Sequence, residues 1–86
     1  RKRQYAKAGE AYARAAELNR NNVRHHGMAA WAFHLNKNDC RMVPYAKRFL
    51  KLCKAKKHKF CTKDFVATTK WALDDYAKKK ICQNSP

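Results

Sequence analysis

Acidic residues are scarce in this sequence of 86 residues. Six aspartates and glutamates stand against 21 lysines and arginines, which gives a formal net charge of +15. This excess is far above what keeps a small domain soluble, and its self-repulsion opposes a compact state. We therefore expect an anionic partner, and nucleic acid, an anionic membrane, an acidic glycan or an acidic protein would each fit.

Glycine and proline are also scarce, with two residues of each, while 45% of the sequence is hydrophobic. Disordered chains show the opposite balance, so this chain is expected to fold. Its length suits one domain with a modest core, which at this size often needs a disulfide, a metal or a partner as reinforcement. We predict a single helical domain over residues 1–82 and a flexible tail at 83–86.

Long apolar runs are missing as well. The longest, Met28 to Phe33, is far shorter than the roughly 20 residues that cross a bilayer. The chain opens with Arg1-Lys2-Arg3 instead of Met and has no signal-like apolar stretch. We interpret it as a processed or trimmed chain.

Residues arranged for catalysis are not evident. The one serine, Ser85, lies in the predicted tail, and the sequence has no glycine-rich phosphate loop. General acids and bases could come from four histidines: His25, His26, His34 and His58. The first two fall among polar residues at a helix start, so a structural role is the simpler interpretation. We predict a protein that is not an enzyme and needs no cofactor, with a histidine-pair nuclease as the catalytic alternative.

What the sequence does have is helical periodicity. Apolar residues recur at i, i+3 and i+4, alanine is frequent, and asparagine-rich or lysine-rich breaks separate the periodic segments. The pattern predicts an all-α bundle of about four helices, spanning roughly 2–19, 23–36, 42–56 and 62–80. We expect Gly27 to let another helix approach closely, Pro44 to lie at the start of the third helix, and Thr62 to cap the fourth.

The aromatic residues fall mostly on the apolar stripes, so we expect them in the core and not as platforms for stacking bases. In the second helix, Met28, Trp31 and Leu35 form one such stripe. Phe60, beside a lysine-rich connection, is the aromatic residue expected to be exposed. On the fourth helix, Lys70/Asp74, Asp74/Lys78 and Asp75/Lys79 have the i, i+4 spacing of surface ion pairs.

The first helix resembles the second helix of a tetratricopeptide repeat. The resemblance rests on Tyr5, Ala8, Tyr12, Ala15 and Leu18. It covers a small part of the chain, Arg20 stands where that family has proline, and the next helix pair does not repeat the pattern. The resemblance implies a peptide-binding module, and a generic helical hairpin with similar packing is the alternative.

Four cysteines allow three disulfide pairings: they are Cys40, Cys53, Cys61 and Cys82. If the last two helices form an antiparallel hairpin, Cys53–Cys61 staples its loop end and Cys40–Cys82 its open end. The spans of 13 and 21 residues differ, so the second pairing needs the chain to fold back. Disulfides imply an oxidising compartment, hence a secreted protein, with a mitochondrial one as the alternative. Free buried thiols, or zinc held by Cys40, Cys53, His58 and Cys61, remain open.

Positive charge is concentrated in residues 40–60, which contain no acid. This basic cluster comprises Arg41, Lys47, Arg48, Lys51, Lys54, Lys56, Lys57 and Lys59. Arg1, Lys2 and Arg3 form a second patch. Lysine outnumbers arginine in the cluster, which favours attraction by point charges over bidentate reading of bases.

These features predict a cationic protein that binds an anionic surface, with a secreted host-defence, cytolytic or interaction role. The partner would be an anionic membrane, an acidic glycan or an acidic protein, and an oligomer is left open. The first alternative is a basic subunit of a ribonucleoprotein or mitochondrial assembly that contacts RNA or acidic neighbours. The second is the peptide-binding module that the tetratricopeptide resemblance implies.

Overall fold

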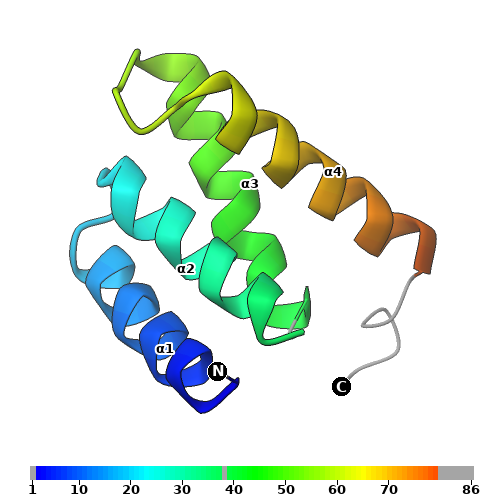
Figure 1. The fold of residues 1–86 in the computed structure, drawn as a ribbon. Helices are drawn as coiled ribbons and strands as arrows, with labels where there is room; N and C mark the ends of the chain where they lie inside the picture. The colour runs from blue at the N-terminus through cyan, green and yellow to red at the C-terminus, as the bar shows by residue number, and fades with distance from the viewer. Residues whose placement is uncertain (1, 38, 80–86) are drawn as a thin grey trace.

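The computed structural model describes residues 2–37 and 39–79, and the regular elements within them are all α-helices. They are α1 (Lys2–Leu18), α2 (Val23–Leu35), α3 (Asp39–Ala55) and α4 (Lys63–Lys79). Figure 1 shows the chain reversing direction at each connection, so successive helices run antiparallel. The predicted all-α bundle of four helices is confirmed.

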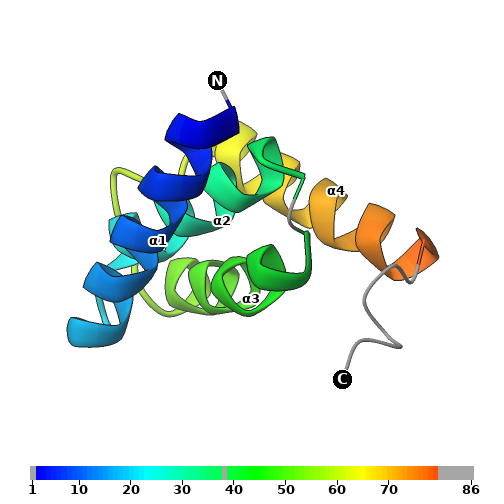
Figure 2. The same cartoon turned by 90° about the horizontal axis from the view of Figure 1, so that it is seen from below.

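The middle of the bundle is the pair of helices α2 and α3. α2 packs closely against both α1 and α3, whereas α4 contacts α3 less extensively and α2 at only a few positions. Figure 2 shows α3 beneath α2, with α1 and α4 on opposite sides of this pair. The largest fully buried side chains are Phe33 of α2 and Met42 and Phe49 of α3. The core therefore lies where α2 and α3 face each other.

α2 turns a different face to the core from the one the sequence predicts. Its buried residues include Ala29, Ala30, Ala32 and Phe33, whereas Trp31 is 41% exposed. The expectation that Trp31 lies in the core was wrong, and Met28 and Leu35 of the same stripe are only half-buried. A helix packed on two sides needs narrow faces, and alanine allows both neighbours to come close.

Gly27 lies where α2 closely approaches α3 and α4. A Cβ atom at this position would come within 2.9 Å of the Phe49 ring on α3 and 3.1 Å of the Phe65 ring on α4. Both distances are shorter than ordinary van der Waals contacts, so the absence of a side chain lets the two rings pack over the α2 backbone. The prediction of close approach at Gly27 is confirmed.

Two helix starts agree with the predictions from the sequence, and one differs from its prediction. The Asn22 side chain accepts a hydrogen bond from the His25 amide at 3.0 Å, and the Thr62 hydroxyl caps α4 by accepting one from the Phe65 amide at 3.1 Å. α3, however, begins at Asp39, so Pro44 lies inside the helix and not in its first turn. Because Pro44 has no N–H, the helix loses the bond to the carbonyl four residues earlier, and tertiary packing stabilises it there.

The stapled hairpin of α3 and α4 is present. Cys53, near the end of α3, is disulfide-bonded to Cys61, just before α4, with Cα atoms 5.7 Å apart. This bond confirms the predicted pairing and rules out zinc at these sulfurs, which are no longer thiolates. Cys40 also takes part in a disulfide, and its predicted partner, Cys82, lies outside the described residues.

The aromatic residues divide between core and surface. Phe33 and Phe49 are buried as predicted, but Trp71 is 60% exposed and Tyr5 36% exposed. Phe60 is half-buried against Phe65, with their ring centroids 5.3 Å apart, so its predicted exposure was wrong. The helical period places a ring on a face of its helix but does not say whether another helix covers that face.

A candidate anion-binding surface

The outward face of α3 is cationic because its opposite face forms the core. Met42, Ala46 and Phe49 recur at helical spacing and are 0–1% exposed. Lys47 and Lys51 lie on the other side of the same helix and are exposed. The residues that bury α3 therefore also orient its lysines towards solvent.

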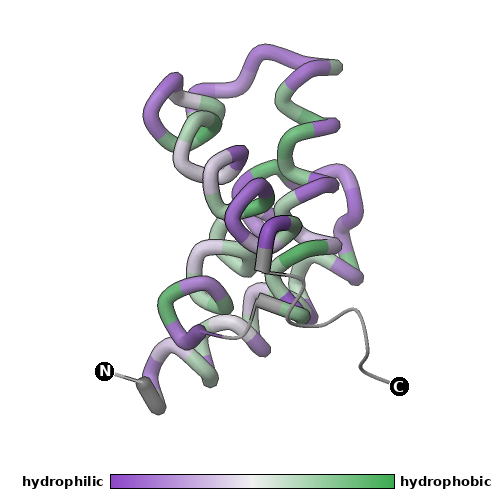
Figure 3. Tube along the Cα trace, turned by 90° about the vertical axis from the view of Figure 1, so that its right-hand side faces the viewer, coloured by the Kyte–Doolittle hydropathy of each residue, from purple (hydrophilic) through white to green (hydrophobic). Residues whose placement is uncertain are grey.

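Six lysines continue from this face into the connection to α4, and we call them the lysine ridge. They are Lys47, Lys51, Lys54, Lys56, Lys57 and Lys59, and each is exposed. Figure 3 shows the connection between α3 and α4 as an almost unbroken hydrophilic stretch at the top of the molecule. The Cys53–Cys61 disulfide closes this stretch at its base and limits how far its lysines can move.

The lysine ridge has no ion pair with any carboxylate among the described side chains. The two described ion pairs lie elsewhere and join Arg20 to Glu17, at 3.3 Å, and Arg41 to Glu10. The ammonium groups of the ridge therefore repel one another with no neutralising partner from the described part of the chain, and an external anion would relieve that repulsion.

The two arginines of the basic cluster differ from its lysines. Arg41 pairs with Glu10 of α1 and stacks over the Phe33 ring, with its guanidinium carbon 4.8 Å from the ring centroid. Arg48 is exposed, and its charge acts on the buried His26. Because Arg41 joins α1 to α3 within the fold, we leave it out of the proposed surface. Arg48 directly follows Lys47 of the ridge in the chain.

Lys2 and Arg3 of the N-terminal patch belong to the first turn of α1. α1 begins at the end of the bundle away from the connection between α3 and α4 (Figure 1). Arg1 and the side chains of Lys2 and Arg3 lie outside what the structure describes. The prediction that they bind anions stays a prediction.

Sequence reasoning missed the contribution of α4 to this surface. Lys70 lines a shallow hollow between α3 and α4 together with Lys54. The predicted pairs Lys70/Asp74 and Asp74/Lys78 do not form ion pairs among the described side chains, so Lys70 keeps its charge unneutralised. Lys63, at the start of α4, is also exposed. The signal was present in the one-turn spacing of Val66 and Lys70, which places them on the same face of the helix.

The histidines lie in different surroundings. Among the described residues, no cluster of three or more His, Cys, Asp or Glu side chains is arranged to hold a metal ion. His58 accepts a hydrogen bond from the Phe60 amide at 3.0 Å within its own turn. His26 is only 3% exposed, contrary to the polar surroundings expected for it.

His26 is buried, and one of its two ring nitrogens is hydrogen-bonded. Its Nε2–H donates to the Arg20 carbonyl at 2.8 Å, while its buried Nδ1 has no hydrogen-bond partner among the described groups. Burial has the largest effect on the pKa of His26 and lowers it below 6.5, although the hydrogen bond to the Arg20 carbonyl opposes this as the next largest effect. The positive charge of Arg48 lowers the pKa further, and the smaller effects of Glu17 and His25 raise and lower it, respectively.

Stability is therefore expected to fall as the pH drops below about 6.5. Because the pKa of His26 is lower in the folded protein, the unfolded chain takes up a proton at a higher pH than the folded protein does. The contribution of neutral His26 to the free energy of unfolding is therefore complete above the pKa of the unfolded chain, and it is lost as the pH falls from there towards the pKa of the folded protein. Urea midpoints at pH 8, 6.5 and 5 test this. The decrease should diminish in His26→Gln and persist in the exposed control His58→Gln; an equal decrease in native protein and His26→Gln would contradict it.

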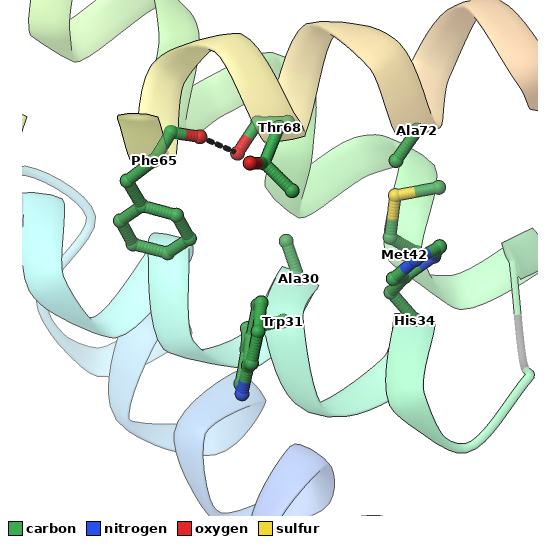
Figure 4. Close-up of a pocket in the computed structure, with 8 residues that line it drawn as sticks. Ala30, Trp31, His34, Met42, Phe65, Thr68 and Ala72 are labelled. Atoms are coloured by element: carbon green, nitrogen blue, oxygen red, sulfur yellow. Dashed lines mark hydrogen bonds between the residues drawn. The ribbon is translucent and has the colours of Figure 1, made fainter. Parts of the chain in front are cut away.

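A second hollow lies between α2 and α4. Figure 4 shows the rings of Trp31 and Phe65 at one end of it and His34 and Met42 at the other. Its volume is about 20 Å³, enough for roughly one water molecule. This hollow is a packing gap beside exposed tryptophans and is too small for a ligand.

Comparison with known proteins adds no assignment. No protein-family model matches the chain, and no curated protein or solved structure is significantly similar to it. Within the described residues, no helix has the length and apolar character needed to span a membrane.

Proposed function

We propose that this chain is a non-catalytic binding protein that docks on an anionic surface through the lysine ridge. The observation that carries the proposal is the lack of a described ion pair for six exposed lysines. Their positions on α3 and on a disulfide-closed connection make the charge a stable feature of the surface, and binding to an anion lowers its electrostatic free energy.

Docking would occur at the surface of a membrane, without insertion of α3. Met42 and Phe49, the apolar residues an amphipathic membrane helix would need, are 0–1% exposed because they form the core. A cytolytic activity would therefore require the bundle to open or to oligomerise. Peripheral attraction needs neither, because each lysine near an anionic bilayer contributes about 1 kcal/mol.

The disulfide supports a secreted or otherwise extracytosolic location. Cytosolic thiols are kept reduced, whereas Cys53 and Cys61 are bonded. A mitochondrial location remains the alternative, together with a role as a basic assembly subunit that contacts RNA. The predominance of lysine supports binding to a charged surface over base-specific reading.

Co-sedimentation with vesicles tests the proposal. We expect the protein to bind vesicles of phosphatidylglycerol and phosphatidylcholine, to ignore pure phosphatidylcholine, and to be released as salt rises from 50 to 500 mM, because screening shortens the range of the attraction. A trapped dye should stay inside if docking is peripheral. Binding to immobilised heparin and to structured RNA is measured in parallel, so that the three kinds of anion can be compared.

Each contrary outcome assigns a different function. Strong retention on RNA, without binding to anionic vesicles or heparin, would overturn the proposal in favour of the assembly subunit. Binding to none of the three anions would leave the peptide-binding module that the tetratricopeptide resemblance implies.

A further inference from the structure

The hollow between α3 and α4 combines an apolar floor with a cationic rim. The two helices diverge from the stapled connection, as Figure 1 shows. Its lining consists of Leu50, Cys53, Lys54, Cys61, Val66 and Lys70. Leu50, Val66 and the two bonded cysteines are half-buried and form the floor, and the two lysines are exposed.

The rim places positive charge on both walls. Lys54 comes from α3 and Lys70 from α4, no carboxylate lines the hollow, and neither lysine forms an ion pair with a described acid. Lys54 also belongs to the lysine ridge, so the hollow opens directly beside that surface. An anion drawn to the ridge would meet two ammonium groups and, between them, apolar atoms.

We propose that this hollow binds an anionic amphiphile with a phosphate or carboxylate head group. The head group lies between Lys54 and Lys70, and the first methylene groups of the chain cover Leu50, Val66 and the disulfide. A wholly polar anion would leave this apolar floor exposed to water, whereas an acyl chain would bury it. The inference rests on the proposed function and narrows its anionic surface to one that carries apolar chains.

The size of the hollow limits what it can hold. Its volume of about 150 Å³ is below the 300–1,000 Å³ typical of pockets that enclose a small ligand. It accommodates the head-proximal end of one chain and leaves the remainder outside. This suits a lipid that stays in a bilayer as well as a free amphiphile, so the experiment separates the two sources.

The test fills the hollow without changing the charge. Val66→Phe adds a ring at the floor, and Ala67→Phe adds the same ring at the next, exposed position of α4, which does not line the hollow. Titrations use monomeric dodecyl phosphate below its micelle concentration and, separately, inorganic phosphate. We expect dodecyl phosphate to bind at least tenfold more weakly to Val66→Phe than to native protein or Ala67→Phe, and inorganic phosphate to bind weakly to all three.

The rim is tested with a second matched pair. Lys70→Ala removes a charge from the hollow and Lys7→Ala removes one from an exposed position on α1, outside both the hollow and the ridge, so only the first should weaken dodecyl phosphate binding several-fold. Circular dichroism melts verify that each variant folds. Equal dodecyl phosphate affinity in Val66→Phe and Ala67→Phe, or equal affinity of native protein for dodecyl phosphate and inorganic phosphate, would overturn the proposal.

Two further measurements separate source and function. Weaker binding of Val66→Phe to phosphatidylglycerol vesicles identifies a bilayer lipid as the ligand; if only dodecyl phosphate is affected, the ligand is a free amphiphile. Heparin binding depends on the ridge alone and should be unchanged in Val66→Phe. If the native protein binds heparin but shows no preference for dodecyl phosphate over inorganic phosphate, this inference is overturned and the proposed function still stands.

Discussion

Reversing four charges of the lysine ridge is expected to weaken binding to anionic vesicles about a thousandfold. The variant carries Lys47→Glu, Lys51→Glu, Lys54→Glu and Lys57→Glu. Four lysines at about 1 kcal/mol each account for about 4 kcal/mol of attraction, and every 1.4 kcal/mol changes affinity tenfold. The introduced glutamates also repel the anionic vesicle, so a thousandfold loss of affinity is the lower limit of the expected effect. Vesicle titration at low salt measures it.

A matched control separates the ridge from the net charge. Lys7→Glu, Arg14→Glu, Arg24→Glu and Lys78→Glu change the charge by the same amount at exposed positions on α1, α2 and α4. We expect this variant to keep vesicle affinity within about tenfold, because its altered charges are distributed away from the ridge and are partly screened. Equal losses in the two variants would show that net charge, not the ridge, drives binding. Survival of binding in the ridge variant would place the site elsewhere.

Phe49→Ala is expected to lower the free energy of unfolding by about 3–5 kcal/mol. Phe49 is fully buried, its ring centroid lies 4.8 Å from that of Phe65, and it packs over Gly27. Its removal leaves a cavity where α2, α3 and α4 meet. A small domain has a total stability of about 5–15 kcal/mol, so the loss should be plain in urea unfolding.

The control and the coupling test use two other positions. Leu18→Ala truncates a side chain that is 84% exposed and should change stability by less than about 0.5 kcal/mol. Gly27→Ala should destabilise the native protein, because steric overlap with Phe49 at 2.9 Å outweighs the better helix propensity of alanine. In the Phe49→Ala background this penalty should shrink. An unchanged penalty would mean that the ring is not what Gly27 accommodates.

Much of the local structure could be predicted from the chain alone. The asparagine-rich break after α1 and the Thr62 cap of α4 depend on neighbouring residues, and their hydrogen bonds form within three residues. The Cys53–Cys61 pairing also follows from local geometry, because a short connection between antiparallel helices returns the chain to nearly the same place. The lysine ridge could be located because the buried residues of α3 define the opposite face.

The predictions of burial were wrong where a neighbouring helix determines which face of a helix is covered. The stripe of Met28, Trp31 and Leu35 is apolar and periodic, yet α2 turns its alanines towards the neighbours on both sides. Small residues carry little hydrophobic signal, but they permit the closest packing, which the period of a single helix cannot reveal. For the same reason Trp71 was expected in the core, although α4 touches α2 at only a few positions.

The sequence by itself determined the helical class, the excess of positive charge and the staple between α3 and α4, because each depends on composition or on residues close together in the chain. Only the tertiary structure decided that Arg41 pairs with Glu10 and that Lys54 and Lys70 share a hollow. It also decided that His26 is buried without a partner for its Nδ1 among the described groups. These features depend on how helices distant in the sequence cross one another, and that geometry is set by the packing of side chains from all four helices.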